Sequence, residues 1–345
     1  MKPRLRANRI VRGLAITFAL AATVADAGGP HLSQQRAGTV PVRIHPQPKL
    51  KAGDKLRYLV QFQTINQTKR TGTVSDPQGP SQTVVTWDAA LLVEVLPPAT
   101  AATAPAAEPG KIRIRTTYEK SVAKLESDTP DPEQESVEKQ YAQMQGRSIE
   151  FALDSAGHVS DVKGLEGIVS DKEALAAAQR WMAQFSTGLG VPAAGIAPGD
   201  KWTTEEPAAS LPLAGYVWRT DSTYLRNEPC RPASLSATPQ SYASETCAVI
   251  LAQLSMNDPR SKKNLTPDEF RQNGLTTSGT WSGTGESLTY ISLTNGWAVS
   301  VTQQMAEQVD VTITTVADRN GVRYSGSVDT RSSLSLAPPE AAAAP

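Results

Sequence analysis

Histidine is scarce in this chain of 345 residues, and its scarcity limits the chemistry that the protein can perform. Only His31, His45 and His158 are present, and the first two fall in a polar segment, 28–49, which we predict to be disordered. A serine or cysteine nucleophile needs a base within hydrogen-bond reach, and a zinc site needs several His or Cys ligands. His158 follows a turn at Gly157, so we interpret it as a hairpin side chain. We therefore predict no catalytic residue, no cofactor and no metal site.

The sequence also lacks a surplus of charge of either sign. Lysine plus arginine and aspartate plus glutamate number 34 each, so no basic field is available to collect nucleic acid. Five acids lie close together in one segment, but their spacing does not match a calcium loop, and the dipole at a helix start favours acids there. They are Asp128, Asp131, Glu133, Glu135 and Glu138. A pair of catalytic carboxylates requires few recognisable sequence features, so a secreted hydrolase that works through carboxylates stays open as an alternative.

Long apolar runs are absent except near the start of the chain. Residues 1–27 combine a basic start, an apolar run at 13–25 and the small-x-small site Ala25-Asp26-Ala27, which is the pattern of a secretory signal. We predict cleavage after Ala27 and export to the periplasm or the extracellular space of a bacterium. The run is shorter than the roughly 20 residues that span a bilayer, so we do not expect a membrane-spanning protein.

Cysteine is limited to Cys230 and Cys247. An oxidising compartment allows such a pair to close into a disulfide, and the segment between them has the composition of a loop. The alternatives are two buried thiols or half of a metal site. We predict the disulfide, because no histidine or further cysteine lies nearby.

The segments that remain indicate a mainly β protein of the α+β class, with antiparallel sheets and two or three packed helices. Strands are predicted at 55–63, 82–96, 111–118, 216–225 and 247–256. Two hairpins are predicted as well, one from 149–153 to 159–162 through a turn at 154–157, and one from 309–313 to 322–336 through a turn at 318–321. Helices are predicted at 131–146, at 170–187 after a capping box, and at 266–271. The dipeptide Asn295-Gly296 favours a type I′ hairpin turn. Residues 97–110 are interpreted as a disordered insertion, and 337–345 as a disordered tail.

A faint internal repeat predicts two tandem related units, 50–190 and 196–336. Three landmarks recur in the same order: residues 50–55 and 196–201, residues 129–131 and 266–268, and residues 146–162 and 285–301. The competing interpretation is that β proteins reuse the same turn chemistry.

Aromatic residues are the remaining indication of function. Five of them fall near the inward phase of predicted strands and could line an apolar ligand, or could simply fill the cores: Tyr58, Phe62, Phe151, Tyr290 and Trp297. In outline alone, without a shared motif, the chain resembles the half-barrel carriers that move lipids or lipoproteins across bacterial envelopes. We expect a non-enzymatic binding or envelope-accessory protein whose partner is a lipid-like molecule or an envelope protein. The alternatives are the carboxylate hydrolase and a purely structural envelope scaffold.

Overall fold

The computed structural model describes the parts of the chain that form regular structure. The described residues are 43–46, 49, 51–73, 79–97, 111–128, 134–154, 159–164, 191–192, 194–208, 212–230, 245–257, 265–315 and 321–337. The predicted signal segment, the insertion after Pro97, the turn at Gly157 with His158, and the predicted helix at 170–187 lie outside them.

The described elements are eleven strands and two short helices. In chain order they are β1 (Lys55–Gly72), β2 (Ser81–Leu96), β3 (Ile112–Ser127), α1 (Gln134–Ala142), β4 (Ser148–Leu153), β5 (Val159–Lys163), β6 (Lys201–Pro207), β7 (Val217–Pro229), β8 (Thr246–Asn257), α3 (Asp268–Gln272), β9 (Leu275–Ser292), β10 (Ala298–Thr315) and β11 (Gly321–Leu336). The prediction of a mainly β protein with few helices is confirmed.

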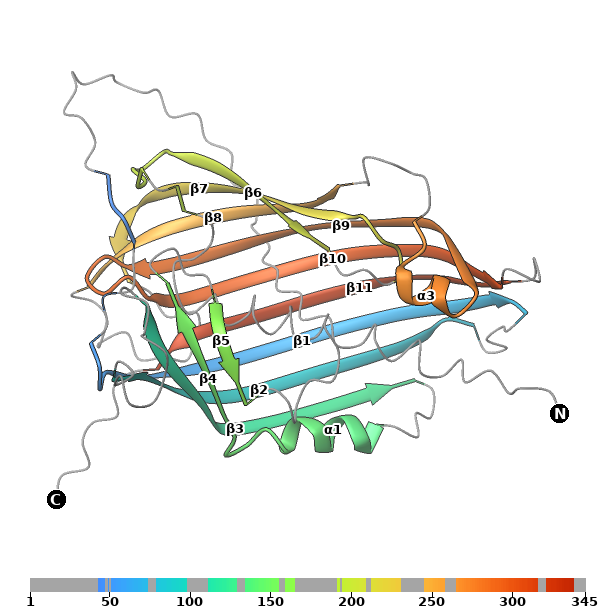
Figure 1. The fold of residues 1–345 in the computed structure, drawn as a ribbon, viewed down its shortest axis with the longest axis horizontal. Helices are drawn as coiled ribbons and strands as arrows, with labels where there is room; N and C mark the ends of the chain where they lie inside the picture. Colours follow the sequence, from blue (N-terminus) through green and yellow to red (C-terminus); the bar gives the residue numbers. More distant parts are fainter. Residues whose placement is uncertain are drawn as a thin grey trace.

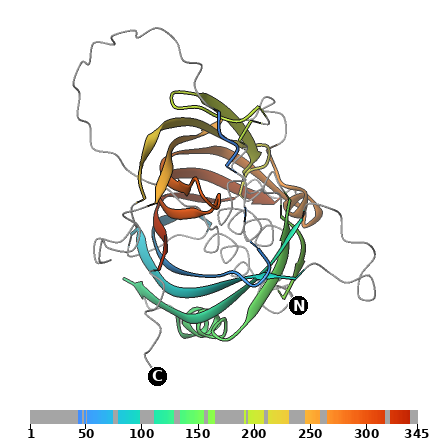
Figure 2. The ribbon, with the colours of Figure 1, turned by 90° about the vertical axis from the view of Figure 1, so that its left-hand side faces the viewer.

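All eleven strands belong to one antiparallel sheet, in the order β5-β4-β3-β2-β1-β11-β10-β9-β8-β7-β6. The two predicted units therefore share a continuous sheet, joined where β1 pairs with β11 from Tyr58↔Leu336 to Gly72↔Val322. The long central strands run side by side, with α1 next to β3 and α3 next to β9 (Figure 1). Seen from its end, the sheet is strongly curved, and it is not closed (Figure 2).

Alternation of apolar residues buries one face of β1 and β2, whereas in β8 four consecutive residues, 247–250, are buried, so both faces are covered there. In β2, the side chains of Trp87, Ala89, Leu91 and Val93 are all buried and every second residue is more exposed. They pair in register with Phe62, Val60, Tyr58 and Leu56 of β1, so the apolar residues of neighbouring strands lie on the same face. Helix α1 adds Tyr141 to this apolar layer, and the turn that follows the helix adds Met144.

The turns that precede β1 and β6 have the same geometry. Gly53 and Gly199 both have φ +94°. In each turn the following aspartate accepts a backbone hydrogen bond through Oδ2, from Lys51 N (2.8 Å) to Asp54 and from Ala197 N (3.0 Å) to Asp200. The first landmark of the sequence repeat thus has one local structure in both places. The duplication itself stays a prediction.

The hairpin between β9 and β10 differs from the predicted type I′ turn. Ser292 N donates to Trp297 O (2.8 Å) and Gly296 N donates to Ser292 O (2.9 Å), so the loop has four residues. Gly296 has φ +75°, whereas Asn295 is not among the described residues with positive φ. Side chains explain the longer loop, because Ser292 Oγ accepts bonds from Thr294 N and Asn295 N, and Asn295 Oδ1 accepts one from Trp297 N.

Part of the segment predicted to be disordered at 28–49 is ordered. Ile44 forms an isolated antiparallel bridge with Ile196. The Arg43 guanidinium contacts the Asp200 carboxylate at 2.6 Å. These contacts tie residues 43–46 to the turn before β6.

Candidate functional site

The buried face of the sheet carries an aromatic cluster at one end, and this cluster brings together most of the predicted ligand-lining residues. Tyr58 and Phe62 of β1, Phe151 of β4 and Trp297 before β10 are all buried in it. Tyr290 of β9 is partly buried against the cluster. Segments distant in sequence therefore meet there, because curvature of the sheet brings β4 near β1 and the β9–β10 loop.

Hydrogen bonds hold some of these rings in place. The Tyr58 hydroxyl donates to Ala298 O across 2.7 Å, and the Tyr290 hydroxyl donates to Glu228 Oε1 across 2.6 Å. Trp297 is fully buried, yet its Nε1 has no hydrogen-bond partner in the described structure. A buried unpaired donor costs free energy, about 1–3 kcal/mol.

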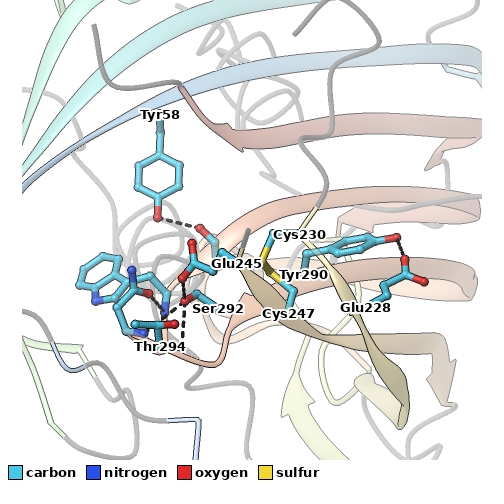
Figure 3. The surroundings of a disulfide bond; sticks show 11 residues. Tyr58, Glu228, Cys230, Glu245, Cys247, Tyr290, Ser292 and Thr294 are labelled. Atoms are coloured by element: carbon cyan, nitrogen blue, oxygen red, sulfur yellow. Dashed lines mark hydrogen bonds between the residues drawn. A yellow bond between two sulfur atoms is a disulfide. The ribbon is translucent and has the colours of Figure 1, made fainter. Parts of the chain in front are cut away.

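The predicted disulfide is confirmed beside this cluster (Figure 3). Cys230 and Cys247 are joined with 4.9 Å between their Cα atoms, and the bond links the end of β7 to the start of β8. Both cysteines pack into the aromatic cluster. Nearby, the Ser292 hydroxyl donates to the Glu245 carboxylate while it accepts from the loop N–H groups. This serine caps a turn, and no histidine is among its hydrogen-bond partners in the described structure.

Beyond the aromatic cluster the buried face carries several polar residues, in a band that we call the polar strip. It consists of Thr64 and Asn66 of β1, Thr330 and Ser332 of β11, and Glu307 of β10. The buried Met305 of β10 lies opposite Thr330 within this band, and a second apolar cluster around Trp281 and Val311 follows beyond it. Register places Thr64 opposite Thr330, and places Asn66 and Glu307 on either side of Val328. Thr330 Oγ1 donates to Thr64 Oγ1 (3.3 Å). Asn66 Oδ1 and Ser332 Oγ are buried without a hydrogen-bond partner in the described structure, which is uncommon for native proteins.

Glu307 is the one acid of the strip. The residue is 9% exposed, and Oε2 accepts a hydrogen bond from Trp281 Nε1 across 2.9 Å. Burial raises the pKa of Glu307 to about 7, against a partial opposing effect of the Trp281 hydrogen bond. No charged group contributes to this pKa shift. The carboxyl is thus poised between its neutral and ionised forms near neutral pH.

Glu307 is not among the residues predicted from the sequence, although its position in β10 carries a signal. The alternation of Val309, Val311 and Ile313 identifies one face of β10, and two residues earlier that alternation reaches Glu307. An acid in the apolar phase of a strand was the available indication. Its importance depends on Trp281 and on neighbouring strands, which single-strand periodicity does not reveal.

The acidic run has structural contacts rather than a shared site. Asp128 Oδ2 accepts from Gln82 N (2.9 Å), Glu138 Oε1 accepts from Leu125 N (3.0 Å), and Glu135 pairs with Lys139 at 2.6 Å. Asp131 and Glu133 lie outside the described residues. Within the described ranges, no three His, Cys, Asp or Glu side chains form a group that could hold a metal ion.

A groove on the sheet and the character of the helices also bear on binding. A groove of about 360 Å³ lies along β1, β10 and β11, and none of the five predicted aromatics lines it. Its lining residues include Gln67, Lys69, Gln308 and Ser327. Of the helices in the described part of the chain, neither has the length and apolar character required to cross a membrane.

Neither a protein-family model nor a curated protein matches the sequence. Solved structures give weak likenesses. A structure of lipid–protein interactions in lipovitellin aligns with 85% of this chain at 11% identity and a TM-score of 0.41, while this chain spans about a quarter (26%) of that one. DynF from the dynemicin biosynthesis pathway of Micromonospora chersina has 8% identity and a TM-score of 0.16, over 92% of this chain and 94% of its own. An outer membrane channel from Pseudomonas putida F1 has 8% identity and a TM-score of 0.18, over 86% and 99%. These scores are too low to support a conclusion about function.

Proposed function

We propose that the protein is an exported, non-enzymatic binding protein that holds an apolar, lipid-like molecule against the buried face of its curved sheet. The observation that carries the proposal is the division of this face into an aromatic cluster and a polar strip with unpartnered buried groups. An amphipathic molecule has the same two parts, so its apolar chain would contact the rings and its polar end the strip.

The disulfide supports the exported location in this proposal. Disulfides persist in oxidising compartments such as the periplasm. The pattern at residues 1–27 gives an independent reason to expect export. We therefore place the protein in the periplasm or the extracellular space in this proposal.

Native mass spectrometry of the protein purified from its host tests the binding proposal. We expect a mass excess that disappears after extraction with organic solvent, and a lipid-like compound in the extract. Protein refolded from denaturant without lipid is the control, and it should show only the mass of the polypeptide. If the host-purified protein also has only that mass, and binds no amphiphile afterwards, the structural scaffold becomes the better reading.

The carboxylate hydrolase remains the competing class, and Glu307 is the acid that it would need. Such a mechanism uses two carboxyl groups, whereas no second acid contributes to the pKa of Glu307. We expect no hydrolysis of ester or glycoside substrates. An activity that is abolished by Glu307→Gln or by His158→Ala would contradict the non-enzymatic proposal.

A further inference from the structure

Glu307 lies among aromatic side chains of two other strands. Trp281 of β9 donates to its Oε2. Gly283, also on β9, lies between Glu307 and Trp218 of β7. A Cβ atom on this glycine would be 2.4 Å from Trp218 Cη2 and 3.3 Å from Glu307 Cγ. The edge of the Trp218 ring and the Glu307 side chain are thus within about 6 Å of each other, because the glycine has no side chain to separate them.

The strand residues that flank this carboxyl on the same face carry no positive charge. Along residues 58–68 of β1, and along the residues of β11 and β10 that pair with them on this face, there is no lysine or arginine. Arg70 of β1 comes next on this face and lies opposite Tyr324, which pairs with Val311 of β10. Trp281 is the only hydrogen-bond donor to Glu307 in the described structure, and it contacts Oε2. An anionic head group would be repelled by the ionised acid and would find no counter-charge beside it.

A positively charged group, in contrast, would be attracted to this position. A carboxylate in a poorly solvated place gains a charge-assisted hydrogen bond from an ammonium group. Indole rings attract cations through their π faces when the charge lies within about 6 Å of the ring. Glu307, Trp281 and Trp218 supply both kinds of attraction at one position.

We infer that Glu307, Trp281 and Trp218 bind the ammonium end of an amphipathic ligand whose apolar chain extends toward the aromatic cluster. This inference rests on the proposed function and specifies its ligand class. Val301, which belongs to the aromatic cluster, and Glu307 are six residues apart on β10, which is about 20 Å along a strand. A single lipid-like molecule is long enough to reach both places.

Titration calorimetry of the purified exported chain with three amphiphiles tests the inference. The probes are dodecylammonium, dodecyl sulfate and dodecyl maltoside, each below its micelle concentration, so that only the head group differs. We expect dodecylammonium to bind about tenfold or more tighter than the other two at pH 8, since charge-assisted hydrogen bonds have that effect. Glu307→Gln keeps an acceptor for Trp281 and should remove the preference. Glu126→Gln, an exposed acid on β3 at a position that alternates with the buried Leu125, is the matched control and should keep it.

Two further measurements keep the test decisive if Glu307→Gln does not fold. Trp218→Leu, at a partly buried position, should weaken dodecylammonium binding two- to tenfold and leave dodecyl maltoside unchanged. Dodecylammonium should also bind at least about tenfold tighter at pH 8 than at pH 5.5, because the pKa of Glu307 is about 7. The neighbours of Glu307 on the flanking strands, Trp281 and Gly283 of β9 and Val328 of β11, do not titrate in this range.

The outcomes separate this inference from the proposed function. If all three amphiphiles bind equally well to the wild type and to Glu307→Gln, the ammonium site is refuted while the carrier proposal stands. If dodecyl sulfate is preferred, the site recognises an anion and the inference is wrong. If no amphiphile binds, the proposed function fails and the inference fails with it.

Discussion

Trp281 Nε1 donates a hydrogen bond to Glu307 Oε2 across 2.9 Å, and both groups are buried between β9 and β10. The hydrogen bond from the indole lowers the pKa and so offsets part of the loss of water around the ionised carboxylate, but burial has the larger effect. Burial therefore determines the direction of the pKa shift. The pair is the clearest chemical feature of the buried face.

This pair predicts a dependence of stability on pH. The pKa of Glu307 is about 7 in the folded chain and near its ordinary value of 4.5 when the chain unfolds. The folded state consequently binds more protons between these values, and stability should fall as the pH rises through that window. The loss from this one group is on the order of 3 kcal/mol in total.

Thermal or urea unfolding of the wild type and Glu307→Gln at about pH 5 and about pH 8 measures this effect. The variant should resemble the wild type at the lower pH and be the more stable protein at the higher pH. A Glu307→Gln variant that shows the same pH dependence as the wild type would mean that another group is responsible.

The disulfide predicts that neither cysteine of the host-exported protein is accessible to alkylation without reductant. Cys230 and Cys247 are separated by 17 positions, and closing a loop of this size contributes about 3 kcal/mol in the chain-entropy model. Replacing both with serine should lower the unfolding free energy by about that amount. Intact mass after alkylation and urea unfolding are the measurements. Two alkylated thiols in the native protein would refute the bond.

The turns at Gly53 and Gly199 predict equal costs of substitution. Both have φ +94°, and a Cβ atom at either would meet nothing within 4 Å, so only backbone strain is changed. Gly53→Ala and Gly199→Ala should each destabilise the protein by about 1–2 kcal/mol. Gly326→Ala is the contrast, because its Cβ would be 2.0 Å from Gln67 O and its cost should be clearly larger. Unequal losses of stability at Gly53 and Gly199 would show that the two turns contribute differently to the stability of the fold.

Two buried indoles predict different responses to the same substitution. Trp87 Nε1 donates to Ser121 Oγ (2.9 Å), which in turn donates to Tyr141 O (2.8 Å). Trp297 Nε1 has no partner in the described structure. Trp87→Phe should therefore cost about 1 kcal/mol more than Trp297→Phe, as judged by urea unfolding. A larger cost for Trp297→Phe would reveal a bond to its indole in solution.

The amino-acid sequence determined most of the local structure. Alternation in β1 and β2 depends on the two-residue period of a strand, and the stripe of Val137, Tyr141 and Met144 depends on the helical period. Both are properties of neighbouring residues and need no tertiary information. The disulfide followed from the presence of a single cysteine pair in a chain predicted to be exported. The type I′ turn predicted at Asn295-Gly296 was wrong, and the loop has four residues, 293–296. The Asn-Gly preference takes no account of the hydrogen bonds that the Ser292 hydroxyl accepts from this loop.

Only the tertiary structure decided that one sheet spans both predicted units and that its buried face has an apolar and a polar part. The pairing of β1 with β11 joins residues 250 or more positions apart, and strand periodicity contains no information about which strands become neighbours. Glu307 shows the physical reason. Its pKa, its hydrogen bond to Trp281 and its approach to Trp218 over Gly283 arise from side chains of β10, β9 and β7, with β8 between the last two. Sequence patterns describe each of these strands separately.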